Sequence, residues 1–139
     1  MDNWLSEYSH HLSNLSPDNL DSLRSLLAEN LEFRDPFNQT FTQDAFIDIL
    51  KDMYLKLDQV NFDVHAQVQK GHEGVLYWTF SATSKMTGRF EFEGSSRVVL
   101  GQEGKIELHH DYWDGSELMQ RIPLVGRIIR KLRQKMSHN

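Results

Sequence analysis

One predicted β-strand carries an unusual density of titratable and aromatic side chains: Gly104-Lys105-Ile106-Glu107-Leu108-His109-His110-Asp111-Tyr112-Trp113-Asp114. Its last six residues hold two histidines, two aromatic residues and two carboxylates. A strand that only packs against a core does not need so many polar groups. We therefore expect this strand to bring functional side chains to a pocket.

A second signal lies earlier, in Phe33-Arg34-Asp35-Pro36-Phe37. Pro36 pushes Asp35 out of the helical region of backbone space, so the segment 31–35 is predicted to be extended. If Asp35 faces a cavity, burial among aromatic residues would raise its pKa and suit it for proton transfer. The alternative is that its carboxylate accepts backbone N–H bonds and fixes the turn before Pro36.

Apolar residues at helical spacing predict three helices in the first 57 residues. The first has one apolar face made of Trp4, Leu5, Tyr8, Leu12 and Leu15. The second begins with Ser16 as the N-cap and Pro17 in the first turn, and its stripe is Leu20, Leu23, Leu26 and Leu27. Thr42 caps the third, whose stripe is Phe46, Ile49, Leu50, Met53, Tyr54 and Leu57.

The apolar period then changes to two, which predicts four strands joined by glycine-containing turns. Their ranges are 62–69, 75–84, 89–100 and 105–113. In the first, Phe62, Val64, Ala66 and Val68 are expected on the buried face. Gly94 is expected to mark a bend or a bulge in the third. Helices followed by hairpin-linked strands predict an α+β fold with helices on one face of a strongly curved antiparallel sheet, which leaves a hollow on its concave side.

Charge is distributed unevenly along the chain. Residues 1–120 hold all 20 acids and nine of the 15 bases, a net charge of −11, which argues against nucleic acid as a partner. Residues 121–139 hold six bases and no acid, and Pro123 is expected to open an amphipathic helix there. We expect this helix to dock on the acidic body; an anionic membrane surface or a partner protein are the alternatives. Residues 1–120 are predicted to be one domain.

The order of these elements and the two motifs resemble the nuclear transport factor 2-like superfamily, which includes SnoaL-like polyketide cyclases, ketosteroid isomerases and limonene epoxide hydrolase. The resemblance covers roughly residues 3–120. It implies a cone-shaped α+β roll around an apolar cavity. It also implies a homodimer formed through the outer face of the sheet.

The segment from Leu20 to Pro36 resembles the ketosteroid isomerase segment that ends in Asp-Pro. In that family the aspartate is the base that moves a proton beside a ketone, and Asp35 matches it. Tyr8 matches the tyrosine that donates to the oxyanion. The second oxyanion donor, a protonated aspartate, is replaced here by Ser96, which departs from the isomerase pattern.

The run from Gly104 to Asp114 resembles the corresponding run of the epoxide hydrolase. There an aspartate acts on the attacking water or the epoxide, and Asp111 matches it. The hydrolase's arginine and second aspartate are replaced here by Phe80 and Ala82, which argues against that particular reaction. Asp111 on the convex face in a salt bridge with a histidine is the alternative.

The two faces of the last strand give conflicting indications. Alternation places Lys105, Glu107, His109, Asp111 and Trp113 on one face, and Ile106, Leu108, His110 and Tyr112 on the other. The second set begins more apolar and so indicates the core. The resemblance points Asp111 inward instead. His109 and His110 face opposite sides and cannot chelate one metal together, which leaves open only a metal site assembled from distant strands.

We therefore expect a cavity that binds a small apolar or amphipathic organic molecule. Proton transfer in an isomerisation, cyclisation or hydration is predicted to fall to Asp35 and Asp111, with Tyr8 as the donor. The residues expected to contact the ligand are Phe46, Tyr54, Trp78, Phe80, Ser96, His109 and Trp113. A non-catalytic ligand-binding or protein-interaction module on the same fold is the alternative. No cofactor or metal is called for by any motif, and the N-terminus lacks a signal-peptide pattern, so we expect a cytoplasmic location.

Overall fold

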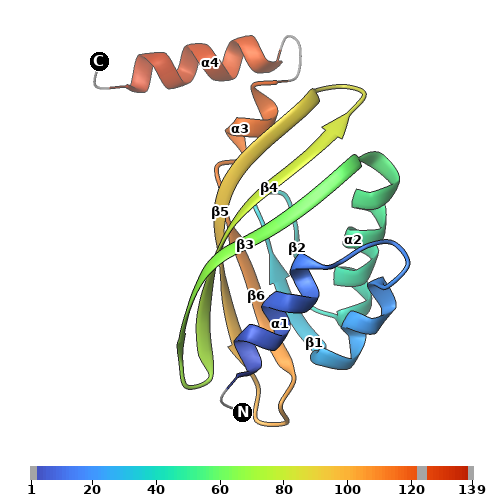
Figure 1. The fold of residues 1–139 in the computed structure, drawn as a ribbon. Coiled ribbons are helices and arrows are strands. Elements are labelled where there is room, and N and C mark those ends of the chain that lie inside the picture. The colour runs from blue at the N-terminus through green and yellow to red at the C-terminus, as the bar shows by residue number, and fades with distance from the viewer. Residues whose placement is uncertain (1–2, 122–124, 138–139) are drawn as a thin grey trace.

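A six-stranded, strongly bent sheet and the helices on its concave side make up the body of the computed structural model (Figure 1). The structure describes residues 3–121 and 125–137. The sheet order is β2-β1-β6-β5-β4-β3. The strands are β1 (Leu27–Arg34), β2 (Gln39–Thr40), β3 (Asp58–Lys70), β4 (Glu73–Ser84), β5 (Gly88–Leu100) and β6 (Ile106–Tyr112). This is the predicted α+β cone with its concave side facing the helices.

Two of the three predicted N-terminal helices are α-helices. α1 (Trp4–Ser13) buries Trp4, Leu5, Tyr8 and Leu12. α2 (Gln43–Lys56) begins as predicted, because the Thr42 hydroxyl accepts a hydrogen bond from the Ala45 N–H at 3.1 Å. Both helices pack against strands, α1 on β3 and α2 on β1.

The second predicted helix is wrong in type and in start. Its residues form a 3₁₀ helix, η1 (Leu20–Leu26), and Leu27 already belongs to β1. The Asn19 carboxamide holds a turn in front of it, accepting from the Ser16 N–H and donating to the Asn14 carbonyl, both at 2.8 Å. Ser16 is therefore part of a turn and does not cap a helix. The spacing of three between Leu20 and Leu23 suits three residues per turn, and both are buried.

The sheet is not antiparallel throughout. β1 pairs with β2 antiparallel but with β6 parallel, and the remaining pairs are antiparallel. The sequence gives no sign of this pairing, because the partner of β1 lies about 80 residues further along the chain. The parallel pairing places Phe33 beside His109 and Arg34 beside His110.

Bulges reverse the alternation in two strands. In β3, Val64 opposes Trp78 but Ala66 opposes Tyr77, so His65 is an extra residue. Beyond it, Gln67 and Gln69 hydrogen-bond to α1. Ala66 is exposed and Val68 is 60% exposed, so the predicted buried positions of Ala66 and Val68 are wrong. In β6, Leu100 opposes Ile106 but Val99 opposes Leu108, so Glu107 is the extra residue.

The β6 bulge resolves the conflict between the two faces of that strand. Ile106 is buried before the bulge, and His109 and Asp111 face the same concave side after it. His110 faces the other side, where its Nε2 lies 2.6 Å from Glu32 Oε2. Each of the two sequence indications is therefore correct for one part of the strand.

C-terminal to β6 come α3 (Ser116–Met119) and α4 (Val125–Met136), and α4 lies beyond the end of the sheet, away from α1 and α2 (Figure 1). The predicted helix start at Pro123 lies outside the described residues. The contact expected between this helix and the acidic body is made by charged groups, because Arg133 lies 3.3 Å from Glu117 and 3.6 Å from Asp114. The apolar side chains Ile128, Leu132 and Met136 are exposed. Over the described ranges, no helix is long and apolar enough to cross a membrane.

Gly94 makes room for an indole ring. The ladder between β4 and β5 continues without interruption through the pair Trp78–Gly94, so of the bend or bulge expected at Gly94 the bulge is excluded. A Cβ atom added to Gly94 would overlap the Trp78 ring. The absence of a side chain at Gly94 lets Trp78 lie flat against β5 on the concave side.

Gly94→Ala is therefore expected to lower the free energy of unfolding by about 1–3 kcal/mol, the usual cost of overpacking a core. Ser95→Ala, one residue along on the outer face, is the matched control and should change stability by less than about 0.5 kcal/mol. Denaturant unfolding of both variants measures the difference. A Gly94→Ala variant as stable as the wild type would contradict the close approach of Trp78.

Candidate functional site

An aromatic cavity of about 220 Å³ lies between the concave face of the sheet and α2. Its walls come from α1, β1, α2, β3, β4, β5, β6 and α3, and most of the side chains that line it are apolar. Ten aromatic residues line it: Phe33, Phe37, Phe46, Tyr54, Phe62, Trp78, Phe80, Phe90, Phe92 and Trp113. The described residues that line it include two carboxylates, Asp35 and Asp111, one histidine, His109, and no lysine or arginine.

The aromatic side chains form a continuous wall along the sheet. Trp113 stacks on Phe92 with 4.2 Å between ring centroids, and Phe92 in turn contacts Trp78 and Phe80. Phe62 covers the other side of Trp78 at 5.0 Å. The rings pack in tilted, edge-on and stacked contacts with one another, so the wall is formed by the protein's own side chains.

Asp111 is the end point of a buried hydrogen-bond chain. Its Oδ1 lies 2.5 Å from Ser96 Oγ and 2.7 Å from His109 Nε2. Trp78 Nε1 lies 2.8 Å from Ser96 Oγ, and Tyr8 Oη lies 2.7 Å from His109 Nδ1. The chain thus joins α1, β4, β5 and β6 at a single carboxylate oxygen.

The donor and acceptor types of these side chains determine which atom carries the hydrogen in each bond of this hydrogen-bond chain. An indole N–H can only donate, so Ser96 accepts from Trp78 and gives its own hydrogen to Asp111. An ionised carboxylate only accepts, so His109 Nε2 carries the hydrogen of that contact. His109 Nδ1 then accepts from the Tyr8 hydroxyl. With a neutral imidazole, each N–H and O–H of this hydrogen-bond chain has an acceptor, and Asp111 Oδ2, which takes no part in it, is left for a ligand.

Tyr8 lies behind the site and does not line the cavity. Its side chain is 1% exposed, and burial, followed by the nearby charge of Asp111, raises its pKa well above the ordinary value. Its hydroxyl therefore stays protonated and donates to His109. Tyr8 is therefore placed to orient His109. The role predicted for it, donation to a ligand oxyanion, requires a hydroxyl that lines the cavity, and Tyr8 is not among the lining residues.

Asp35 lines the cavity at the end of β1, but its carboxylate is engaged in a turn. Oδ1 accepts from the N–H groups of Phe37 and Asn38 at 2.8 and 2.7 Å, and the Asn38 carboxamide contacts both carboxylate oxygens. This is the turn-fixing role that the sequence left as an alternative. Asp35 therefore adds negative charge to one end of the cavity, with its oxygens already in use.

The other expected ligand contacts fall into two groups. Phe46, Tyr54, Trp78, Phe80, His109 and Trp113 line the cavity. Ser96 is fully buried behind its wall, where it links Trp78 to Asp111. Phe62, Phe90 and Phe92 also line the cavity and were absent from the predicted ligand contacts, although the alternation of their strands is the signal that could have found them.

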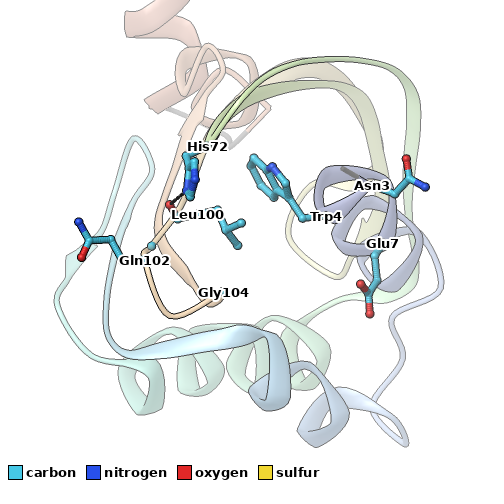
Figure 2. Close-up of a pocket in the computed structure, with 8 residues that line it drawn as sticks. Asn3, Trp4, Glu7, His72, Leu100, Gln102 and Gly104 are labelled. Atoms are coloured by element: carbon cyan, nitrogen blue, oxygen red, sulfur yellow. Dashed lines mark hydrogen bonds between the residues drawn. The ribbon is translucent and has the colours of Figure 1, made fainter. Parts of the chain in front are cut away.

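A larger recess of about 530 Å³ lies elsewhere, between the start of α1 and the turns that follow β3 and β5. Figure 2 shows Asn3, Glu7 and Gln102 spread around it and not converging on one point. The more central polar groups are in use, because Trp4 Nε1 donates to the Gly71 carbonyl and His72 Nδ1 contacts the Leu100 carbonyl. We therefore place the functional site in the smaller, aromatic cavity.

The cone fold and its cavity define a nuclear transport factor 2-like protein, and comparisons with known proteins agree. The model of the SnoaL-like domain matches residues 8–109, so the chain belongs to the SnoaL-like domain family. The search of curated proteins found no significant match.

Solved structures share the fold at low sequence identity. A nuclear transport factor 2-like protein from Burkholderia thailandensis has a TM-score of 0.75 at 15% identity, with 86% of this chain and 94% of that chain covered. A putative polyketide cyclase from Pseudomonas putida has a TM-score of 0.72 at 11% identity, covering 86% and 95%. A hypothetical protein with a ketosteroid isomerase-like fold from Catenulispora acidiphila, in complex with trimethylamine, has a TM-score of 0.71 at 11% identity, covering 87% and 92%.

Tyr8→Phe tests the hydrogen-bond chain. Removing the hydroxyl leaves His109 Nδ1 buried without a donor, so the free energy of unfolding should fall by about 1–3 kcal/mol near pH 8. Because the folded-state pKa of Tyr8 is raised, the wild type loses stability as the pH rises above about 10, whereas the variant lacks this loss. The difference in free energy of unfolding between the wild type and Tyr8→Phe should therefore be smaller near pH 11 than near pH 8.

Denaturant unfolding at the two pH values measures this change. Tyr77→Phe, at a tyrosine that is 43% exposed on the outer face, is the control. It should change the free energy of unfolding by the same small amount at both pH values. A Tyr8→Phe deficit that is the same at both pH values would contradict a buried, protonated Tyr8 hydroxyl.

Proposed function

We propose that this protein binds a small, neutral or cationic organic molecule in the aromatic cavity, and that Asp111 acts there as a general base. The observation that carries the proposal is the asymmetry of the Asp111 carboxylate. Oδ1 holds two hydrogen bonds from buried partners, while the side chain remains 19% exposed on the cavity wall. A base that is held in position in this way needs no reorganisation when a ligand arrives.

The composition of the cavity supports this class of ligand. Ten aromatic residues favour an apolar ring or chain. Asp35 and Asp111 repel an anion, and no lysine or arginine of the described lining compensates them. A protein of the same fold, 11% identical to this chain, was solved in complex with trimethylamine, a small organic molecule.

The reaction that fits is proton removal from carbon beside a carbonyl group. Asp111 Oδ2 would take the proton and become a carboxylic acid, the carbon–hydrogen bond electrons would form the enolate, and Asp111 would return the proton to the same or another carbon. Tyr54 lines the cavity, and because burial raises its pKa its hydroxyl stays protonated, so we assign it as the hydrogen-bond donor to the enolate oxygen. Isomerisation and cyclisation both begin with this step.

The second candidate is a binding module without catalysis. It is favoured by the engagement of the Asp35 oxygens in the turn, which leaves a single carboxylate to handle protons. Ligand binding without accelerated proton exchange would support it.

Preference for uncharged ligands is tested with a matched pair of naphthalenes. We expect 2-naphthol to bind at least about tenfold more tightly than 2-naphthoate, because the anion would lie near two carboxylates in a desolvated site. Isothermal titration calorimetry with the full chain gives both affinities. Equal affinities, or tighter binding of 2-naphthoate, would contradict the charge that we assign to the cavity.

Proton removal is tested by following deuterium exchange at C1 of 2-tetralone in D₂O by proton NMR. The wild type should accelerate the exchange, and Asp111→Asn should lower the enzymatic rate at least about 100-fold, the usual contribution of a general base. The carboxamide keeps an acceptor oxygen for Ser96 and His109, so the variant should fold. Asp63→Asn, on an exposed residue of β3, is the control and should keep the wild-type rate.

A further inference from the structure

We infer that α4 is a docking element for an anionic phospholipid surface. The described residues of α4 hold five bases, Arg127, Arg130, Lys131, Arg133 and Lys135, and no acid. Its apolar side chains are exposed, with Ile128 at 61%, Leu132 at 50% and Met136 at 85%. A helix with an exposed apolar stripe between basic flanks is the kind that lies in the plane of a membrane surface.

The way α4 is attached leaves that stripe free. Arg130 donates to the Gln120 carbonyl, Arg133 lies 3.3 Å from Glu117, and a Cβ on Gly126 would overlap the Gln120 carbonyl. Residues 126, 130 and 133 lie on one side of the helix, because each residue turns the chain by about 100°. Ile128 and Leu132 lie about a quarter to a half turn away from that side. Polar contacts therefore hold the helix while its apolar stripe points elsewhere.

The charges of the molecule favour lipid contact through α4 alone. The body, residues 1–120, carries a net charge of −11 and is repelled by anionic headgroups. Arg127, Lys131 and Lys135 flank the apolar stripe on the side not used for attachment, where they can meet phosphate groups while the stripe enters the headgroup region. Figure 1 shows α4 beyond the end of the sheet, so the body does not stand in the way.

Docking of α4 would bring the bilayer near one wall of the cavity. α4 contacts α3, and Leu118 of α3 lines the cavity. A bilayer concentrates apolar molecules of the kind an aromatic cavity accepts. Binding of α4 to an anionic phospholipid surface does not depend on the proposed chemistry of Asp111.

Vesicle co-sedimentation of the full chain tests the inference. Binding should be at least about tenfold stronger to vesicles with roughly a third phosphatidylglycerol than to phosphatidylcholine alone, and should weaken as the salt rises from about 0.1 to 0.5 M. Ile128→Glu should abolish binding and Arg127→Gln/Lys131→Gln should reduce it about tenfold. Leu55→Glu makes the same charge change at another exposed apolar residue, 85% exposed on α2, and should bind like the wild type.

Three outcomes would overturn the inference. The first is absence of binding to the anionic vesicles, and the second is binding that is equal on neutral vesicles and insensitive to salt. The third is a wild-type oligomer, seen by light scattering, that does not bind vesicles and that Ile128→Glu disrupts. This result would mean that the apolar stripe of α4 binds a second copy of the chain. Circular dichroism of each variant confirms that it is folded, so loss of binding can be read directly.

Discussion

The structure depends on one buried carboxylate oxygen and the two hydrogens that hold it. Removing a carboxylate from water is costly unless hydrogen bonds replace the lost hydration. Asp111 Oδ1 receives these bonds from Ser96 and His109, which are themselves held by Trp78 and Tyr8. Because the four partners come from α1, β4, β5 and β6, satisfying this oxygen also fixes how the helix and three strands meet.

The same constraint shapes the cavity wall. Trp78 must reach Ser96 with its indole nitrogen, which requires the ring to lie against β5, and Gly94 leaves the space for it. Phe62 and Phe92 then pack on the two sides of that ring, and Trp113 stacks on Phe92. The aromatic wall and the hydrogen bonds that hold Asp111 thus belong to one packing arrangement, and a change in either would move the other.

The C-terminal helix α4 is held in place by different interactions from those that hold α1 and α2. Helices α1 and α2 hide their apolar faces under the sheet, as amphipathic helices of globular proteins do. The described part of α4 exposes its apolar stripe and uses basic side chains for attachment. Its position therefore depends on ion pairs that salt screens, whereas the positions of α1 and α2 depend on apolar burial, which salt hardly affects.

The sequence by itself determined the element order, the cap at Thr42, the hairpin turns and the α+β class. These follow from local patterns, since hydrophobic period and turn residues act over a few positions. The tertiary structure alone decided the 3₁₀ form of residues 20–26, the parallel pairing of β1 with β6 and the inward direction of Asp111. A bulge adds one residue and reverses every later side chain, and whether it forms depends on the partner strand. The extra residues at His65 and Glu107 have no local signature, so the faces of β3 and β6 were settled only when the strands paired.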